Sequence, residues 1–306
     1  MSAKRPKQKV DGWVVLDKPL GMGSTKAVGR VRWLFAAEKA GHGGTLDPLA
    51  TGVLPIALGE ATKTVPFVMD GRKEYRFTLC FGEARTTEDA EGEVTATSEA
   101  RPTDEAICAA LGRFTGEIEQ RPPAFSALKI AGERAYDLAR KGETPVLKPR
   151  RVTIERLELT GRPDRDHADF VVACGKGTYI RSLGRDLAQA LGTVGYLSAL
   201  RRTAAGPFRE GAAISLSKLE ALGHIPPLLG ALAPVVTALD DIPALALTEA
   251  QVGRLRQGQP VLLTRDAPPS GALARAELEG KLVALVRLEV SPGGGASVQP
   301  VRVFNL

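Results

Sequence analysis

Cysteine, histidine and aromatic residues are scarce in this chain of 306 residues. It has three cysteines and three histidines, and aromatic residues make up 5% of it. The cysteines, Cys80, Cys108 and Cys174, are odd in number and widely spaced. They therefore predict neither a disulfide framework nor a CxxC metal site. The histidines are dispersed as well, so no Cys/His cluster has the spacing of a zinc site, and we expect no bound metal.

Long hydrophobic runs are absent too. No apolar run approaches the ~20 residues that cross a bilayer, and no apolar segment follows the basic N-terminus as it would in a secretory signal. We expect a cytoplasmic protein without a membrane partner. The motifs GxxxxGK[ST], HExxH and GxSxG are also missing, which excludes P-loop NTPases, zincins and nucleophile-elbow hydrolases.

Positive charge is present but unevenly distributed. The net charge is +6; residues 1–209 carry 33 basic against 26 acidic side chains, and residues 210–306 carry 8 against 9. Residues 121–151 include eight basic side chains and three acidic ones. Such a segment favours a polyanionic partner, although a solvated surface can have the same composition.

The hydrophobic pattern predicts separate runs of strands and helices. Residues 75–81 alternate strictly between apolar and polar, which is typical of a half-buried strand. Further strands are expected at 12–17, 151–159 and 168–174, and helices from Ser24 to near Gly41, after Thr103, and from Thr178 to Leu191. The acidic stretch 82–93 is expected to be a solvated loop. This order indicates an α+β fold, for which we expect a mixed, largely antiparallel sheet.

Two segments interrupt this rhythm. Residues 121–151 are bounded by prolines and predict a basic insertion between strands, with a short helix around 133–141. After residue 210 the chain becomes rich in Ala, Leu and Pro, which indicates a linker followed by a small β-rich unit with a helix near 249–255. We place the boundary between a catalytic domain, 1–235, and a C-terminal domain, 236–306.

The segment GHGGTLDPLATGVLP, residues 41–55, is the most informative stretch. Three glycines among its first four residues allow positive φ and close approach of the backbone to a bulky ligand. Asp47 precedes Pro48, which pushes its backbone to an extended conformation, and the flanking apolar residues place this carboxylate against a core. Composition alone leaves two alternatives open: a functional carboxylate, or an Asx-turn residue that caps the next segment.

Several ordered blocks give this segment a context. They are GWVVLDKPLGMGS at 12–24, GEATK at 59–63, KEYRFTLCFG at 73–82, RPPAFSALKIAGERAYDLAR at 121–140, CGKGTYIRSLGRDL at 174–187 and YLSALRRTAAGPF at 196–208. Together with GHGGTLDPLATGVLP they resemble the TruB family of tRNA pseudouridine synthases over roughly 200 residues. Two positions depart from the family pattern, which usually has threonine where this chain has Gly23 and Gly43.

The resemblance implies a pseudouridine-synthase catalytic domain followed by a PUA-like domain, and an enzyme that converts uridine 55 in the T loop of tRNA to pseudouridine. It implies that Asp47 is the catalytic carboxylate, that Arg181 is its partner, and that Tyr75 stacks on the flipped uracil. Burial disfavours the charged form of a lone carboxylate, and an adjacent guanidinium restores it. From the residues alone, Arg181 also fits a surface arginine and Tyr75 a core aromatic.

The resemblance further implies a set of substrate contacts. These are His42 beside the T-loop bases, Tyr179 and Leu200 against the base, Lys18 and Lys63 at phosphates, and Lys129, Arg140 and Lys141 in the insertion. From the residues alone, His42 also fits a loop histidine without a role, and Lys18 and Lys63 also fit solvated lysines. The target base must leave its stack to reach a buried carboxylate, and recognition should depend on the shape and phosphates of the tRNA T arm.

The reaction breaks the N1–C1′ bond, turns the base and joins C5 to C1′, with no net redox change. A carboxylate can initiate it, so we expect no metal and no organic cofactor. We also expect a monomer with no obligatory protein partner. The alternatives are a non-catalytic RNA-binding protein or tRNA-folding chaperone, a carboxylate glycosidase, and a guide-RNA-dependent relative. A chaperone role in addition to catalysis stays open.

Overall fold

A large mixed sheet forms the body of the protein in the computed structural model, which describes residues 6–126, 129–130, 133–134, 147–223, 227–263, 270–290 and 296–306. The sheet has ten strands, with the central order β14-β1-β3-β12-β4-β11-β10-β7, while β13 pairs with β12 and β2 with β3. The strands are β1 (Gly12–Lys18), β2 (Ala40–His42), β3 (Ala50–Leu58), β4 (Lys73–Phe81), β7 (Gly116–Gln120), β10 (Arg150–Gly161), β11 (His167–Cys174), β12 (Gly195–Ala205), β13 (Phe208–Arg209) and β14 (Ile214–Ser215). Pairs β1–β14 and β12–β3 are parallel and the others antiparallel, which confirms the predicted α+β fold.

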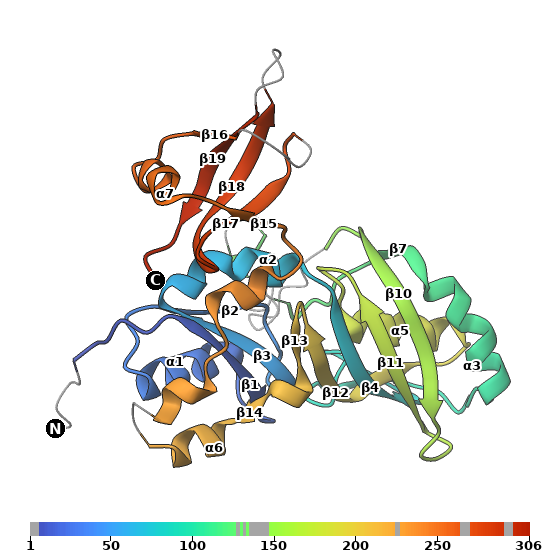
Figure 1. The fold of residues 1–306 in the computed structure, drawn as a ribbon. Coiled ribbons are helices and arrows are strands. Elements are labelled where there is room, and N and C mark those ends of the chain that lie inside the picture. Colours follow the sequence, from blue (N-terminus) through green and yellow to red (C-terminus); the bar gives the residue numbers. More distant parts are fainter. Residues whose placement is uncertain are drawn as a thin grey trace.

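Helices and short strands connect these elements (Figure 1). The helices are α1 (Ser24–Leu34), α2 (Val65–Asp70), α3 (Asp104–Leu111), α5 (Ile180–Ala190), α6 (Leu216–Ala221) and α7 (Glu249–Arg256), with 3-10 turns η1 (Gly59–Thr64), η2 (Gly112–Phe114), η3 (Glu210–Ala212), η4 (Pro227–Ala231) and η5 (Val235–Leu239). Helices α3 and α5 lie against one face of the strands β4, β11 and β10. Among the described residues, no helix is both long and apolar enough to cross a membrane.

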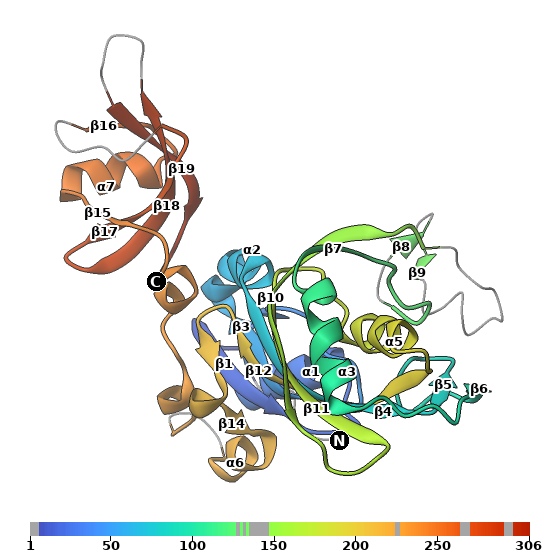
Figure 2. The same cartoon turned by 90° about the vertical axis from the view of Figure 1, so that its right-hand side faces the viewer.

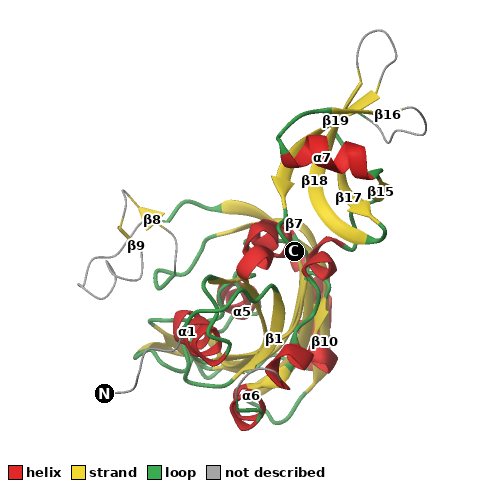
Figure 3. Cartoon of the chain, turned by 60° about the vertical axis from the view of Figure 1, so that its left-hand side comes forward, coloured by secondary structure: helices red, strands yellow, loops and turns green. Residues whose placement is uncertain are grey.

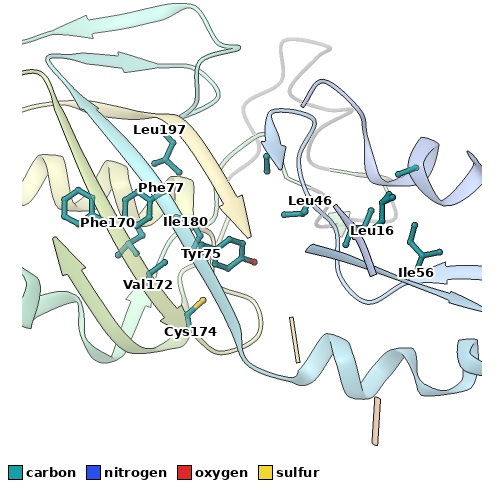
Figure 4. Packing of buried hydrophobic residues seen from close by; sticks show 14 of the residues in the cluster. Leu16, Leu46, Ile56, Tyr75, Phe77, Phe170, Val172, Cys174, Ile180 and Leu197 are labelled. Carbon is teal, nitrogen blue, oxygen red and sulfur yellow. The ribbon is translucent and has the colours of Figure 1, made fainter. Parts of the chain in front are cut away.

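The main core lies between this sheet and the helices. On β4 the side chains of Tyr75, Phe77, Leu79 and Phe81 are buried, as the alternation predicted. Phe77 stacks on Phe170 of β11 with ring centroids 5.0 Å apart, and Figure 4 shows Tyr75 at the end of this row. The sheet therefore places Tyr75 at the boundary between core and cleft.

A separate five-stranded sheet forms the C-terminal unit, with the order β15-β17-β18-β19-β16. Its strands are β15 (Ala244–Ala246), β16 (Val261–Leu263), β17 (Leu273–Leu278), β18 (Lys281–Val290) and β19 (Ala296–Val303). This confirms the predicted small β-rich domain and adds β17, which the sequence pattern did not reveal. Leu285 and Phe304 of this unit share a buried cluster with Trp13 and Val53 of the large sheet, so an apolar interface joins the two parts.

Inside the basic insertion the structure describes a short hairpin, β8 (Lys129–Ile130) with β9 (Glu133–Arg134), besides residues 121–126 and 147–151 at its two ends. Figures 2 and 3 show it on the opposite side of the large sheet from the C-terminal unit. The helix expected around 133–141 is wrong for residues 133–134, and the remainder of that prediction lies outside the described residues.

Two other sequence predictions need correction. Ser24 is not the N-cap of α1: Gly23 is, and the Ser24 hydroxyl bonds Leu46 instead. The stretch 82–93 is not simply a solvated loop, because it contains strand β5 (Glu83–Arg85), which pairs with β6 (Val94–Thr97), and because Thr87 and Asp89 are buried. Its acidic composition reflects ion pairs with the buried Arg181 and the half-buried Arg185 as well as contact with solvent.

Candidate active site

The loop that carries Asp47 lies between β2 and β3 and is fixed by hydrogen bonds on both sides of the carboxylate. The amide of Gly21 donates to the carbonyl oxygen of Pro48 at 2.9 Å. The hydroxyl of Ser24 donates to the carbonyl of Leu46 at 2.7 Å and accepts from the amide of the same residue at 2.8 Å. Because Pro48 also restricts the backbone of Asp47, the loop presents this side chain in one position.

A buried ammonium supports the loop from the N-terminal strand. Lys18, at the end of β1, is fully buried. Its Nζ donates to the carbonyl oxygens of Pro19 at 3.0 Å, Met22 at 2.7 Å and Pro48 at 3.2 Å. The three donors of one ammonium therefore tie the turn after β1 to the residue that follows the catalytic candidate.

A buried guanidinium supports the loop from β12. Arg202 is 1% exposed, and its Nε donates to the carbonyl of Val53 at 2.7 Å. Its Nη2 donates to the carbonyl of Gly44 at 2.9 Å, and Nη1 to that of Thr45 at 3.3 Å. One side chain thus joins the residues before and after Asp47, which makes the loop part of the rigid sheet.

Arg181 comes from the first turn of α5 and faces Asp47. Its Nη2 lies 3.0 Å from Oδ2 of Asp47, and Nη1 lies 3.8 Å from Oδ2 of Asp89. Nη1 also donates to the carbonyl of Thr87 at 2.7 Å, and Nη2 to that of Phe125 at 2.8 Å. The guanidinium is 5% exposed, so these contacts replace the water that it loses.

A pocket of about 290 Å³ opens beside this ion pair. Asp47, Tyr75, Tyr179, Arg181 and Leu200 all line it. Burial raises the pKa of the Tyr75 phenol, so this side chain enters the pocket as a neutral ring with a hydroxyl. The pocket combines one carboxylate, aromatic and aliphatic walls and a guanidinium, which suits a flat polar ring attached to a charged backbone.

The aromatic wall is itself fixed by polar partners. Tyr179 is the N-cap of α5, and its amide donates to Oε1 of Gln120 at 2.8 Å. Nε2 of Gln120 donates to the carbonyl of Tyr179 at 3.0 Å. The guanidinium of Arg150 lies 4.7 Å from the centre of the Tyr179 ring and also lines the pocket. A cation over an aromatic face is a favourable arrangement, and it places a positive charge on the wall of the pocket.

Buried cations outnumber buried carboxylates in this region. Burial lowers the pKa of Lys18 to about 8, with the charge of Asp47 opposing this shift and that of Arg202 adding to it. Burial likewise lowers the pKa of Lys73, a further pocket residue, to about 8, and Arg202 again adds to the shift. The floor of the pocket is therefore electropositive, which favours an anionic ligand or a negative charge that develops during a reaction.

Comparisons with known sequences assign the chain to a family. Residues 32–180 match the TruB family pseudouridylate synthase (N terminal domain), and residues 181–242 match the tRNA pseudouridylate synthase B C-terminal domain. A protein from Bradyrhizobium diazoefficiens named tRNA pseudouridine synthase B is 58% identical over 99% of this chain and 88% of its own. One of the same name from Caulobacter vibrioides is 51% identical over 100% of both chains. The chain belongs to the TruB family of pseudouridylate synthases. It is therefore an isomerase.

Solved structures show the same fold. A chain in the crystal structure of a Cbf5-Nop10-Gar1 complex superposes with a TM-score of 0.74 at 28% identity, covering 95% of this chain and 84% of that one. A chain in the structure of an H/ACA RNP bound to a substrate RNA containing 2′-deoxyuridine gives a TM-score of 0.74 at 26% identity, covering 96% and 85%. These likenesses confirm the predicted pseudouridine-synthase fold.

Lys18 and Lys63, which were expected to contact phosphates in this TruB-family chain, both have their ammonium groups bonded within the protein. Lys18 is fully buried under the loop and has no surface to offer to a phosphate. Lys63 lies 2.6 Å from Oε2 of Glu60 and donates to the carbonyl of Val303 at 2.8 Å, at the contact with the C-terminal unit. The phosphate contact predicted for Lys18 is therefore wrong, because the fold encloses its ammonium. That of Lys63, whose side chain is 30% exposed, stays a prediction.

The remaining predicted contacts are only partly described. His42 ends β2 beside the loop, where its Nδ1 accepts from the amide of Gly44 at 3.3 Å, and burial lowers its pKa. This imidazole is therefore neutral at pH 7. Of the insertion residues, Lys129 lies in β8, whereas Arg140 and Lys141 lie outside the described residues.

The sequence interpretation missed Arg202, Lys73 and Asp89. One signal was available for Arg202: two consecutive arginines in a strand must point to opposite faces. Arg201 pairs with Asp17 at 3.0 Å, and Arg202 points inward. No comparable signal marked Asp89, because it lies in a stretch of five acidic residues whose partners are distant in sequence.

The two departures from the family pattern have different surroundings. A Cβ atom at Gly23 would meet nothing within 4 Å. At Gly43 it would lie 2.5 Å from Cγ1 and 3.0 Å from Cβ of Val68, which is fully buried in α2. Gly43 is therefore required by the packing of α2 against the loop, whereas Gly23 is not constrained in this way.

Proposed function

We propose that the enzyme converts uridine 55 in the T loop of tRNA to pseudouridine, with Asp47 as the carboxylate that initiates the reaction. The observation that carries this proposal is the contact between Asp47 and Arg181 at the edge of an aromatic-walled pocket. Its relatives are named for tRNA and pseudouridine, and the described basic residues around the pocket fit a polyanionic substrate.

The chemistry assigns a task to each side chain. The target uridine is flipped out of the T loop at a cost of a few kcal/mol, and its base enters between Tyr75, Tyr179 and Leu200. Asp47 acts as nucleophile or base, the N1–C1′ bond breaks, and the base turns before C5 bonds to C1′. The proton leaves C5 and one is gained at N1, so atoms and charge balance without an oxidant.

The protein contributes geometry and electrostatics to these steps. Arg181, whose side chain is 5% exposed, compensates the charge of Asp47, whose side chain is 39% exposed and faces the pocket. The neutral phenol of Tyr75 lies beside the base and can relay the C5 proton, accepting it at the hydroxyl oxygen as its own hydroxyl proton passes to another acceptor. The buried cations favour negative charge on the departing base. His42 contacts neighbouring bases of the T loop, and Lys129, Arg140 and Lys141 contact the RNA backbone.

The same proposal covers the organisation of the chain. Residues 1–235 form the catalytic domain and residues 236–306 an accessory domain; in support, all five strands of the second sheet lie between residues 244 and 303. The protein acts as a cytoplasmic monomer on the tRNA T arm, without a guide RNA or an obligatory protein partner.

A direct assay tests the proposal. An unmodified T-arm transcript is incubated with the enzyme, and pseudouridine is mapped by carbodiimide treatment and primer extension. We expect one modified position, uridine 55, in the wild-type reaction and none with Asp47→Asn. Modification at another uridine would overturn the assigned position, and modification by both proteins would overturn the role of Asp47.

A further inference from the structure

A second arginine follows Arg181 on the same face of α5. Arg185 lies four residues later, one helical turn along the axis, and its side chain is 22% exposed. Its Nη1 contacts Oε1 of Glu88, its Nη2 donates to the carbonyl of Arg121 at 2.9 Å, and its Nε lies 2.8 Å from Oδ1 of Asp186. It does not line the pocket described above, so it does not belong to the surface that meets the uridine.

The segment 87–89 divides its contacts between the two arginines. The carbonyl of Thr87 and the carboxylate of Asp89 meet Arg181. Glu88, between them, turns its carboxylate the other way, toward Arg185 and toward the Ser182 hydroxyl, which donates to it at 3.2 Å. Thr87 and Asp89 thus contact the helical turn that carries Arg181, and Glu88 contacts the next turn, which carries Arg185.

The backbone of Glu88 has an uncommon conformation, which the surrounding contacts hold in place. Its φ is +61°, in the left-handed region that residues other than glycine rarely adopt. Such a conformation persists only where neighbouring contacts determine it. Those contacts are the ion pair with Arg185, the bond from Ser182 and the amide of Leu197, which donates to the carbonyl of Glu88 at 3.0 Å.

The segment that leads into the insertion is held in the same way. Arg181 donates to the carbonyl of Phe125, and Arg185 to that of Arg121, four residues earlier. Both arginines therefore bridge the same two segments, 87–89 and 121–125. Arg181 does so beside the carboxylate of Asp47, and Arg185 does so one turn farther from it.

We propose that Arg185 and Glu88 are positioning residues, which hold the carbonyls of Thr87 and Phe125 where they orient the Arg181 guanidinium toward Asp47. This inference rests on the proposed function and extends it to two residues outside the pocket. Without the ion pair between Arg185 and Glu88, the segments 87–89 and 121–125 lose one of the contacts that link them. The Arg181 guanidinium then moves together with the two carbonyls to which it donates. A displacement of ~1 Å at a catalytic contact costs about 100-fold in rate.

Arg185→Ala, Arg185→Lys and Glu88→Gln test the proposal in single-turnover assays. We expect Arg185→Ala to lower the rate of pseudouridine formation by about 10- to 100-fold while the Kd for a T-arm transcript stays within about threefold of wild type. Arg185→Lys, which keeps the charge for Glu88, should recover part of the rate. The control Arg30→Ala removes an exposed ion pair with Glu220 on α1 and α6 and should leave rate and Kd unchanged.

A double-mutant cycle separates positioning from general stability. If Arg185 acts through Arg181, Arg181→Lys combined with Arg185→Ala should be within about threefold of Arg181→Lys alone. Losses that multiply, or a Kd that weakens as much as the rate, would overturn the proposal. Should Arg185→Ala fail to fold, Glu88→Gln carries the same test, because it removes the charge but keeps the volume.

A structural readout keeps this inference distinct from the proposed function. A crystal structure of Arg185→Ala should show the Arg181 guanidinium moved away from its 3.0 Å contact with Asp47. An unchanged contact overturns the positioning role even if the wild type is active. If the contact is altered in Arg185→Ala but the wild-type enzyme makes no pseudouridine, the proposed function is refuted and the positioning role is retained.

Discussion

The ion pair between Asp47 and Arg181 is asymmetric. Its two atoms, Oδ2 and Nη2, lie 3.0 Å apart, yet the arginine side chain is 5% exposed and the aspartate side chain 39%. The protein holds the cation through backbone carbonyls on two segments and leaves the anion facing the pocket. A ligand can therefore reach the carboxylate without displacing the group that compensates its charge.

The first prediction concerns this carboxylate. Asp47→Asn keeps the volume and the loop but removes the negative charge, so a T-arm transcript should bind within about tenfold of wild type while no pseudouridine forms. Filter binding and carbodiimide mapping measure the two quantities. Asp70→Asn, which removes an exposed carboxylate that pairs with Lys176, is the matched control and should retain activity. Product formed by Asp47→Asn would refute the assignment.

A second prediction concerns RNA affinity. Reversing Arg140, Lys141, Arg150 and Arg151 to glutamate should weaken tRNA binding. It should also flatten the dependence of log K on log salt by about 0.7–0.9 for each phosphate that the variant no longer neutralises. The control makes the same change in charge at exposed positions of the C-terminal unit. These are Arg254, Arg256, Lys281 and Arg287. Equal effects of the two sets would move the RNA site away from the insertion.

The contact between the two domains gives a third prediction. Phe304 is 2% exposed and packs in the cluster that contains Trp13. Phe304→Ala should lower the free energy of unfolding by about 3–5 kcal/mol, measured by denaturant titration with tryptophan fluorescence. Leu262→Ala, at a side chain that is 72% exposed, should change it by less than about 0.5 kcal/mol. Similar values for the two variants would show that the interface contributes little.

Lys73 gives a prediction on pH. Its pKa is about 8 in the folded protein against an ordinary value of 10.5. Between these values the unfolded chain binds more protons, so this lysine makes the free energy of unfolding rise with pH. The contribution is complete above pH 10.5 and is lost as the pH falls through about 8.

Unfolding measured between pH 8 and 10 checks this sign. Lys73→Met should remove a positive slope of at most ~1.4 kcal/mol per pH unit, the value for one proton. Lys281→Met, at an exposed position of β18, should keep the wild-type slope. A Lys73→Met protein with the slope of the wild type would show that this ammonium is not buried in solution.

The fold was largely predictable because its signals are local. The alternation of 75–81 and the helix from Thr178 depend on neighbouring residues, and both appear in the structure with their ends within two residues of the predicted ones. The proximity of Asp47 to Arg181 was reached through resemblance. Spacing alone cannot show that residues 134 positions apart meet, because the contact depends on how β3, β12 and β4 pair.

What the sequence did not reveal are contacts that depend on the whole fold. Lys18 was expected at a phosphate, yet its ammonium is enclosed by the carbonyls of Pro19, Met22 and Pro48. Glu88 and Asp89 looked like solvated acids until α5 brought two arginines beside them. The partners of these two acids lie far away in sequence, Arg185 for Glu88 and Arg181 for Asp89, so the local pattern cannot assign them.

The packing of Gly43 against Val68 has a consequence for exchanging motifs within the family. A segment 41–55 from a relative with threonine at position 43 would drive that side chain into α2, 2.5 Å from Cγ1 of Val68. Such a chimera should be destabilised by this clash, and its stability should recover when Val68→Ala is introduced with it. The side chains at positions 43 and 68 therefore have to be exchanged together, and α2 beneath the loop decides which versions of the motif this scaffold accepts.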